Sequence, residues 1–138
     1  MTEVATTLLR GARHRWKVLG IGVAANACFS MVVGGLPATA VFMRADYNIS
    51  NAELGFVLGM LGLGIAISEL PWGLLTDRWG DRPILLTGLL STGAMLLLMA
   101  AFAAPHNGFI PAYGLLITGV LFIGLLGSSV NGSSGRAI

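Results

Sequence analysis

Four long apolar stretches joined by short polar connections constrain what this chain of 138 residues can fold into. The hydrocarbon core of a bilayer is about 30 Å thick, and a helix rising 1.5 Å per residue needs about 20 apolar residues to cross it. The stretches meet that length, at about 18–42, 54–75, 83–104 and 112–132. They lack the two-residue alternation of membrane strands and are rich in Leu, Ala, Met and Gly. The sequence therefore predicts an all-α membrane protein with four transmembrane helices.

The composition favours the same class of protein. Hydrophobic residues make up 55% of the chain and charged residues only 10%, whereas a soluble domain carries about 25% charged residues. Outside the first 17 residues there is no basic stripe, which argues against nucleic-acid binding. The single cysteine, Cys28, allows no intramolecular disulfide, and no metal-ligand spacing is present. Without a nucleophile–base pair, a phosphate loop or a metal cluster, we expect no enzyme activity, no cofactor and no metal, with the lipid bilayer as the main partner.

The basic residues predict the orientation in the membrane. Seven of the eight fall at one end of the predicted helices, and only Arg44 falls at the other. Since Lys and Arg concentrate in cytoplasmic segments, we expect residues 1–17 to be a basic cytoplasmic segment, followed by a transmembrane region over 18–138. The chain is then a multi-pass protein of a plasma membrane, such as a bacterial inner membrane. The tryptophans fall near the inner ends and the tyrosines near the outer ends, as in an interfacial belt.

Local signals sharpen the limits of these helices. Ser50-Asn51-Ala52-Glu53 predicts a capping box at the start of the second helix, and Pro83 suits the first turn of the third. Gly55 and Gly59 form a G-x-x-x-G pair, which is typical of close helix packing. A cleaved signal peptide is disfavoured, because the first apolar run is about 25 residues and a signal core is about 7–15.

The second connection carries the most specific motif, G-x-x-x-D-R-x-G-x-R, between two membrane helices. Gly73 can let a neighbouring helix approach closely, and Gly80 can adopt a positive φ in a tight reversal. Asp77 can accept hydrogen bonds from amides at a neighbouring helix N-terminus. Arg78 and Arg82 can hold the loop at the cytoplasmic face. We expect these five residues to form a loop that governs structure and gating.

In this context the chain resembles the major facilitator superfamily of secondary transporters, whose signature lies between the second and third helices. Glu69-Leu70-Pro71-Trp72-Gly73 resembles the end of its second helix, and Gly34-Gly35-Leu36-Pro37 the outer half of its first. Members usually have about twelve helices in two six-helix halves. The resemblance therefore implies the first four helices of an incomplete N-terminal domain, from a fragment or truncated form that is inactive alone.

The resemblance also implies secondary active transport of a small solute by alternating access, with the proton as a candidate coupling ion. Helices one, two, four and five line the family's cavity in this half, which points to four candidate cavity residues: Asn26, Ser30, Ser128 and Asn131. Hydrogen bonding between helices is the alternative for each. Val120 stands where many proton-driven drug exporters of the family carry an arginine, which argues against that subclass.

Glu69 is the one charged residue within a predicted span. It is a candidate protonation site, or alternatively a polar group near the cytoplasmic mouth, where the cost of a charge falls. Two other functions stay open from the sequence. One is a complete four-helix protein that resembles the small multidrug exporters and acts as a dimer. Those exporters use a glutamate in their first helix, and the first predicted helix of this chain has no acidic residue. The other is a non-transporting membrane subunit.

Overall fold

The computed structural model describes residues 2–106 and 109–130. Over these residues the chain forms five helices and no strand: α1 (Thr2–Ala38), α2 (Ala40–Tyr47), α3 (Asn51–Trp79), α4 (Asp81–Phe102) and α5 (Tyr113–Gly127). Leu19–Ala38 of α1, and all of α3 and α4, are long and apolar enough to cross a membrane. α5 is apolar but has 15 residues, about 22 Å, which is shorter than the hydrocarbon core. The all-α membrane fold predicted from the sequence is confirmed.

The first helix differs most from the predicted range of 18–42. It begins at Thr2, so the basic segment continues into the span without a break, and it ends at Ala38, where α2 follows after Thr39. Pro37 lies in the last turn of α1 and has no N–H to donate to the carbonyl four residues earlier. The predicted ranges 54–75, 83–104 and 112–132 correspond to α3, α4 and α5, and positions 131 and 132 lie outside the described residues.

The start of α3 has the predicted capping box. The Ser50 hydroxyl accepts from the Glu53 N–H at 3.3 Å, and the Glu53 carboxylate accepts from the Ser50 N–H at 2.8 Å. These bonds satisfy the backbone N–H groups of Ser50 and Glu53, which have no partner within the helix. At the other end of α3, Gly80 has a φ of +85° and is the one residue between α3 and α4. The positive φ predicted for Gly80 is confirmed.

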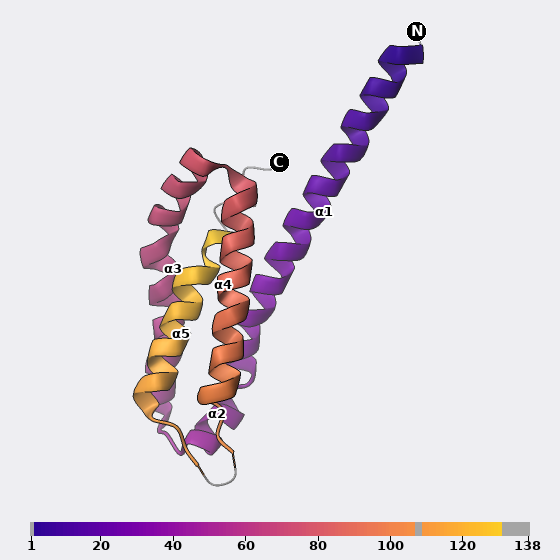
Figure 1. Ribbon diagram of the computed structural model, residues 1–138. Helices are drawn as coiled ribbons and strands as arrows, with labels where there is room; N and C mark the ends of the chain where they lie inside the picture. The colour runs from indigo at the N-terminus through magenta and orange to yellow at the C-terminus, as the bar shows by residue number, and fades with distance from the viewer. Residues whose placement is uncertain (1, 107–108, 131–138) are drawn as a thin grey trace.

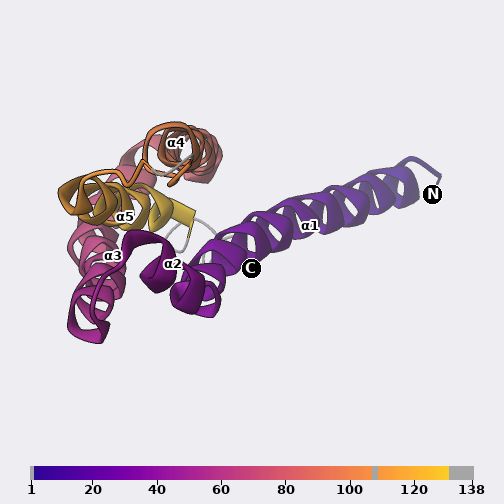
Figure 2. The same cartoon turned by 90° about the horizontal axis from the view of Figure 1, so that it is seen from below.

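α3, α4 and α5 pack side by side, and α1 leans away from them toward its N-terminus (Figures 1 and 2). The α3–α4 turn lies at the same end as the N-terminus, whereas α2 and the α4–α5 connection lie at the opposite end (Figure 1). The main buried cluster joins α2, α3 and α5 and consists of Tyr47, Val57, Leu61, Leu116, Val120 and Ile123. α5 thus forms the centre of the packing, and α3 is its closest neighbour.

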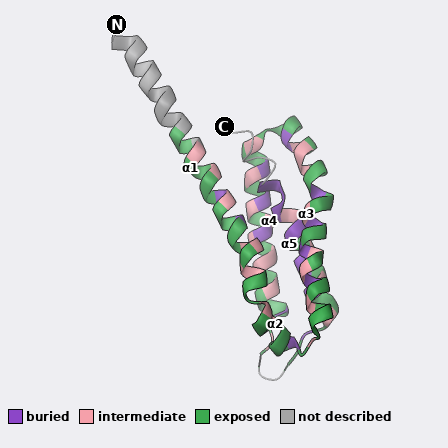
Figure 3. Ribbon diagram, turned by 180° about the vertical axis from the view of Figure 1, so that it is seen from behind, coloured by how far each residue is buried: buried purple, intermediate pink, exposed green. Residues whose placement is uncertain are grey.

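Exposed residues recur along all the described helices (Figure 3), and many of them are large and apolar. Leu70 is 78% exposed, and Met31 and Leu97 are each 74% exposed. In water such a surface would promote aggregation, but hydrocarbon is as apolar as these side chains. The exposed surface is therefore the one a membrane protein presents to lipid or to further helices.

Candidate functional site

The α3–α4 turn brings the predicted signature residues to one end of the fold. Gly80 donates its N–H to the carbonyl of Thr76 at 2.9 Å, which closes the last turn of α3. The side chains of Asp77, Arg78 and Arg82 are exposed around this turn. The charged groups of the loop are therefore displayed at the surface, where a partner outside the described residues can reach them.

Gly73, the first residue of the signature, has no close helix neighbour among the described residues. A Cβ atom added at Gly73 would meet nothing within 4 Å. The same holds for Gly55, Gly59 and Gly62, which recur along α3 at helical spacings of three and four residues. No described residue packs against the Gly55/Gly59 pair, so close helix packing at this pair stays a prediction. These glycines lie on a face of α3 that the described part of the chain leaves uncovered.

The close helix contact is instead between Gly64 of α3 and Gly124 of α5. A Cβ added at Gly64 would lie 2.5 Å from the carbonyl oxygen of Leu121 and 3.2 Å from the carbonyl carbon of Gly124. A Cβ added at Gly124 would meet the carbonyl oxygen of Leu61 and lie 3.2 Å from the Gly64 Cα. Only glycine allows the two backbones to approach so closely.

Ser68 and Ser128 lie one helical turn beyond these two glycines. Ser68 is 6% exposed and Ser128 is fully buried, and their hydroxyl oxygens are 2.6 Å apart. Ser68 also donates to the carbonyl of Gly64 at 2.7 Å. Ser128 therefore takes part in a hydrogen bond between helices. This is the alternative to a cavity role that the sequence left open for this residue.

A third contact joins the same two helices. The indole N–H of Trp72 donates to the carbonyl of Leu125 at 2.7 Å. This carbonyl belongs to the last turn of α5, where the regular hydrogen-bond pattern of the helix runs out. Such a group is costly to leave unpaired in hydrocarbon, so Trp72 allows α5 to end beside α3.

A repeated sequence pattern accompanies this contact. The spacing Gly-x-x-x-Ser occurs at 64–68 and again at 124–128. Small residues four apart mark a helix face that can pack closely. The two copies lie on the faces of α3 and α5 that meet in the structure.

The remaining candidate residues lie apart from this contact. Ser30 of α1 is exposed and donates to the side-chain oxygen of Asn26 at 3.4 Å, one turn earlier. Glu69 is exposed on α3, next to buried Ser68. Asn131 lies outside the described residues. The structure therefore places Asn26 with Ser30, and Ser128 with Ser68, on different helix surfaces.

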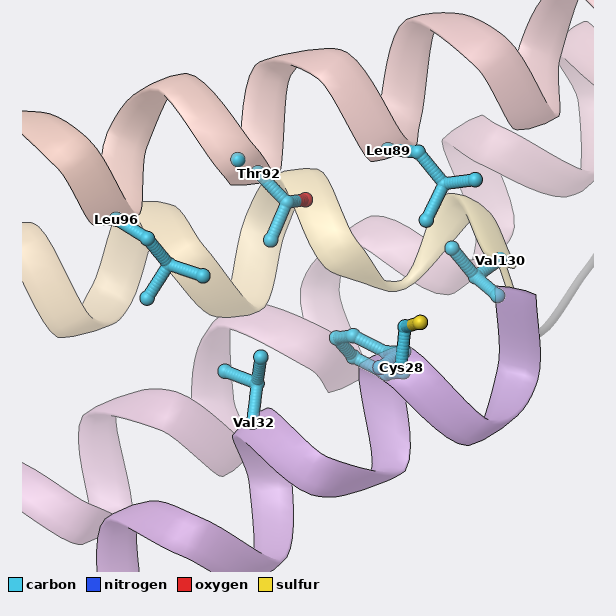
Figure 4. Close-up of a pocket in the computed structure, with 8 residues that line it drawn as sticks. Cys28, Val32, Leu89, Thr92, Leu96 and Val130 are labelled. Atoms are coloured by element: carbon cyan, nitrogen blue, oxygen red, sulfur yellow. The ribbon is translucent and has the colours of Figure 1, made fainter. Parts of the chain in front are cut away.

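A cavity of about 130 Å³ lies between α1, α4 and the end of α5 (Figure 4). Its lining is almost entirely apolar and includes Cys28, Val32, Leu89, Leu96 and Val130. Thr92 also lines it; the residue is 6% exposed, and its hydroxyl has no hydrogen-bond partner among the described residues. The cavity offers apolar contact, unlike the polar surface that a hydrophilic solute needs.

At the end of the fold opposite the α3–α4 turn, two tyrosines form hydrogen bonds between elements. Tyr47 of α2 donates its hydroxyl to the carbonyl of Ala103, just past α4, and Tyr113 of α5 donates to the carbonyl of Glu53 at 2.9 Å. Burial raises the pKa of Tyr47. These bonds hold α2 against α4, and the start of α5 against the start of α3.

Comparison with known proteins adds an independent finding. The family model described as Major Facilitator Superfamily matches residues 19–138. The inner membrane transport protein YajR of Escherichia coli is 37% identical over 54 residues, which cover 39% of this chain and 12% of that protein. Protein zinc induced facilitator-like 1 of Arabidopsis thaliana is 36% identical over 70 residues, 46% of this chain and 15% of that protein. No solved structure gives a significant match.

Proposed function

Because the chain belongs to the Major Facilitator Superfamily, we propose that it supplies four membrane helices of a secondary active transporter, which moves a small solute by alternating access. The family match over residues 19–138 carries this proposal. The charged turn between α3 and α4, with Gly80 at a φ of +85°, supports it. The activity is transport rather than catalysis of a chemical reaction.

The packing of the described helices supports a division of roles within the proposed transporter. Gly64 and Gly124 let α3 and α5 pack backbone to backbone, so we treat these two helices as one unit. The opposite face of α3, with Gly55, Gly59 and Gly62, is uncovered. Alternating access requires one bundle to rock against another around a central site. We assign the uncovered face of α3 to contact with helices that complete the transporter.

The lengths of the relatives support the need for further helices. The alignments cover only 12% of YajR and 15% of zinc induced facilitator-like 1. A central cavity lies between two bundles in transporters of this architecture. We therefore propose that these four helices transport only as part of a larger assembly, with Asn26 and Ser30 as candidate solute contacts and Glu69 as a candidate proton site.

Orientation follows from the charges of the two ends. Residues 1–17 and the α3–α4 turn share one end of the fold and carry six of the eight basic residues. We propose that this end is cytoplasmic and that the membrane is a plasma membrane, such as a bacterial inner membrane.

Transport measurements in proteoliposomes test the proposal. The chain is produced from its natural coding region with the flanking sequence intact, and counterflow of a solute panel is measured with and without a proton gradient. Saturable counterflow that is slowed in Asp77→Asn, with the same solute preference, supports the proposal. If the protein is inserted and folded in the vesicles but exchanges no solute, with or without the proton gradient, the proposal is contradicted.

A further inference from the structure

We propose that the N-terminal part of α1 binds the anionic headgroups of phospholipids. Arg10, Arg13, Arg15 and Lys17 fall within eight positions, and the span begins two residues later at Leu19. With Glu3 as the one acid, residues 1–17 carry a net charge of four minus one, or +3 with His14 neutral. A cluster of this size directly beside a span is complementary to an anionic membrane surface.

The helix fixes how far these residues lie from the hydrocarbon. α1 is continuous from Thr2 to Ala38, so Lys17 is about 3 Å and Arg10 about 14 Å along the axis from Leu19. The headgroup layer of one leaflet adds roughly 5–8 Å to the hydrocarbon, and the Debye length at physiological salt is about 8 Å. All four basic residues therefore lie within the headgroup layer or within its electrostatic reach.

No other described helix covers this part of α1. It extends past the α3–α4 turn and stands apart from the other helices in both views (Figures 1 and 2). Trp16 is 73% exposed and Lys17 is exposed. Tryptophan concentrates at the headgroup level, and Trp79, 63% exposed, ends α3 at the same end of the fold. Trp16 and Trp79 thus indicate that the basic residues of α1 start at the headgroup level of the membrane.

The register of the segment favours lipid over nucleic acid. Positions 10, 13 and 17 share one face of an α-helix, since they are three and four residues apart. Such a row follows the axis of α1 and crosses the headgroup layer beside the span. Nucleic acid would need a basic surface that tracks a phosphate backbone over many residues. The phosphates at this depth are those of lipids.

The test is electron paramagnetic resonance of spin-labelled lipids in membranes of the full chain. Trace phosphatidylglycerol or phosphatidylcholine, labelled on the acyl chain, is added to vesicles with the same composition in both leaflets, so that orientation does not matter. The fraction of label immobilised by the protein gives the preference for anionic over zwitterionic lipid. The parent chain is compared with a variant carrying Arg10→Gln, Arg13→Gln, Arg15→Gln and Lys17→Gln. A matched control carries Arg44→Gln, Arg78→Gln and Arg82→Gln.

The parent chain should prefer phosphatidylglycerol by about threefold or more, and the preference should fall in about 0.5 M NaCl. The four-residue variant should lose most of it, and the control should keep most of it. A charge-conserving variant with lysine at positions 10, 13 and 15 should keep it too. Equal immobilisation of both lipids by the parent, or loss of preference in the control alone, overturns the proposal. Retention of a short RNA by the parent without any lipid preference also overturns it.

Discussion

Gly64 of α3 and Gly124 of α5 meet backbone to backbone, with a virtual Cβ on Gly124 only 3.2 Å from the Gly64 Cα. Ser68 and Ser128 add a hydrogen bond one turn away. Glycine removes the side-chain barrier to this approach, and the hydroxyls then satisfy each other where water is absent. The crossing holds together the two helices that form the centre of the described fold.

The first prediction is that Gly64→Ala destabilises the chain and Gly62→Ala does not. The new methyl at position 64 would lie 2.5 Å from a backbone oxygen of α5, whereas the one at position 62 meets nothing within 4 Å. Forcing extra volume into a packed contact costs about 1–3 kcal/mol. Unfolding in mixed micelles with increasing SDS, followed by circular dichroism, measures the difference. Equal midpoints for the two variants would show that this crossing does not hold the fold.

The second prediction concerns the serine pair. Ser68→Ala and Ser128→Ala should each lower the free energy of unfolding, and the double variant should lose less than the sum. Interhelical hydrogen bonds in membranes are worth about 0.6 kcal/mol on average, so the coupling energy should be about that size. Ser91 serves as the control, because its hydroxyl bonds to Gly88 of its own helix. A coupling energy of zero in the double-mutant cycle would show that this hydrogen bond does not contribute to stability.

Local features of the fold could be predicted from the sequence. The capping box of Ser50 and Glu53 and the positive φ of Gly80 depend on residues within a few positions of each other. Which glycines pack could not be predicted in the same way. Gly55 and Gly59 have the same spacing as many small pairs among the 20 glycines, but α3 is turned so that Gly64 faces α5.

The physical reason is the absence of a polar solvent around the helices. In a soluble helix the apolar stripe identifies the buried face, whereas lipid-facing and protein-facing surfaces of a membrane helix are equally apolar. The rotation of each helix is then set by contacts with partners distant in sequence. For the same reason the sequence did not separate the cavity role of Ser128 from its bond to Ser68, which the structure places 2.6 Å away.

The third prediction concerns the end of α5. Trp72→Phe removes the N–H that bonds the Leu125 carbonyl, and in hydrocarbon that carbonyl finds no water. We expect a loss of about 0.6–1.7 kcal/mol in the same SDS titration. Trp79→Phe is the matched control, because Trp79 is 63% exposed. The prediction fails if both tryptophan variants unfold at the midpoint of the parent chain.

The fourth prediction concerns topology. In a Cys28→Ser background, single cysteines replace Asn48 or His106 at one end of the fold and Arg78 at the other. The excess of basic residues at the Arg78 end predicts that only positions 48 and 106 react with a membrane-impermeant maleimide in intact cells. Position 78 should react only after the membrane is permeabilised. Labelling of position 106 from the inside alone would contradict the predicted orientation.

The last prediction is that the 138-residue chain alone inserts but does not transport. Each helix satisfies its own backbone hydrogen bonds, so insertion needs no partner. A solute cavity needs a second bundle to rock against, and the face of α3 with Gly55, Gly59 and Gly62 has no described neighbour. Purified chain in liposomes should therefore show no saturable uptake of organic anions, sugars or cationic dyes under a proton gradient. Uptake that Glu69→Gln or Asn26→Ala abolishes would show instead that four helices suffice, and would favour a small exporter that works as a dimer.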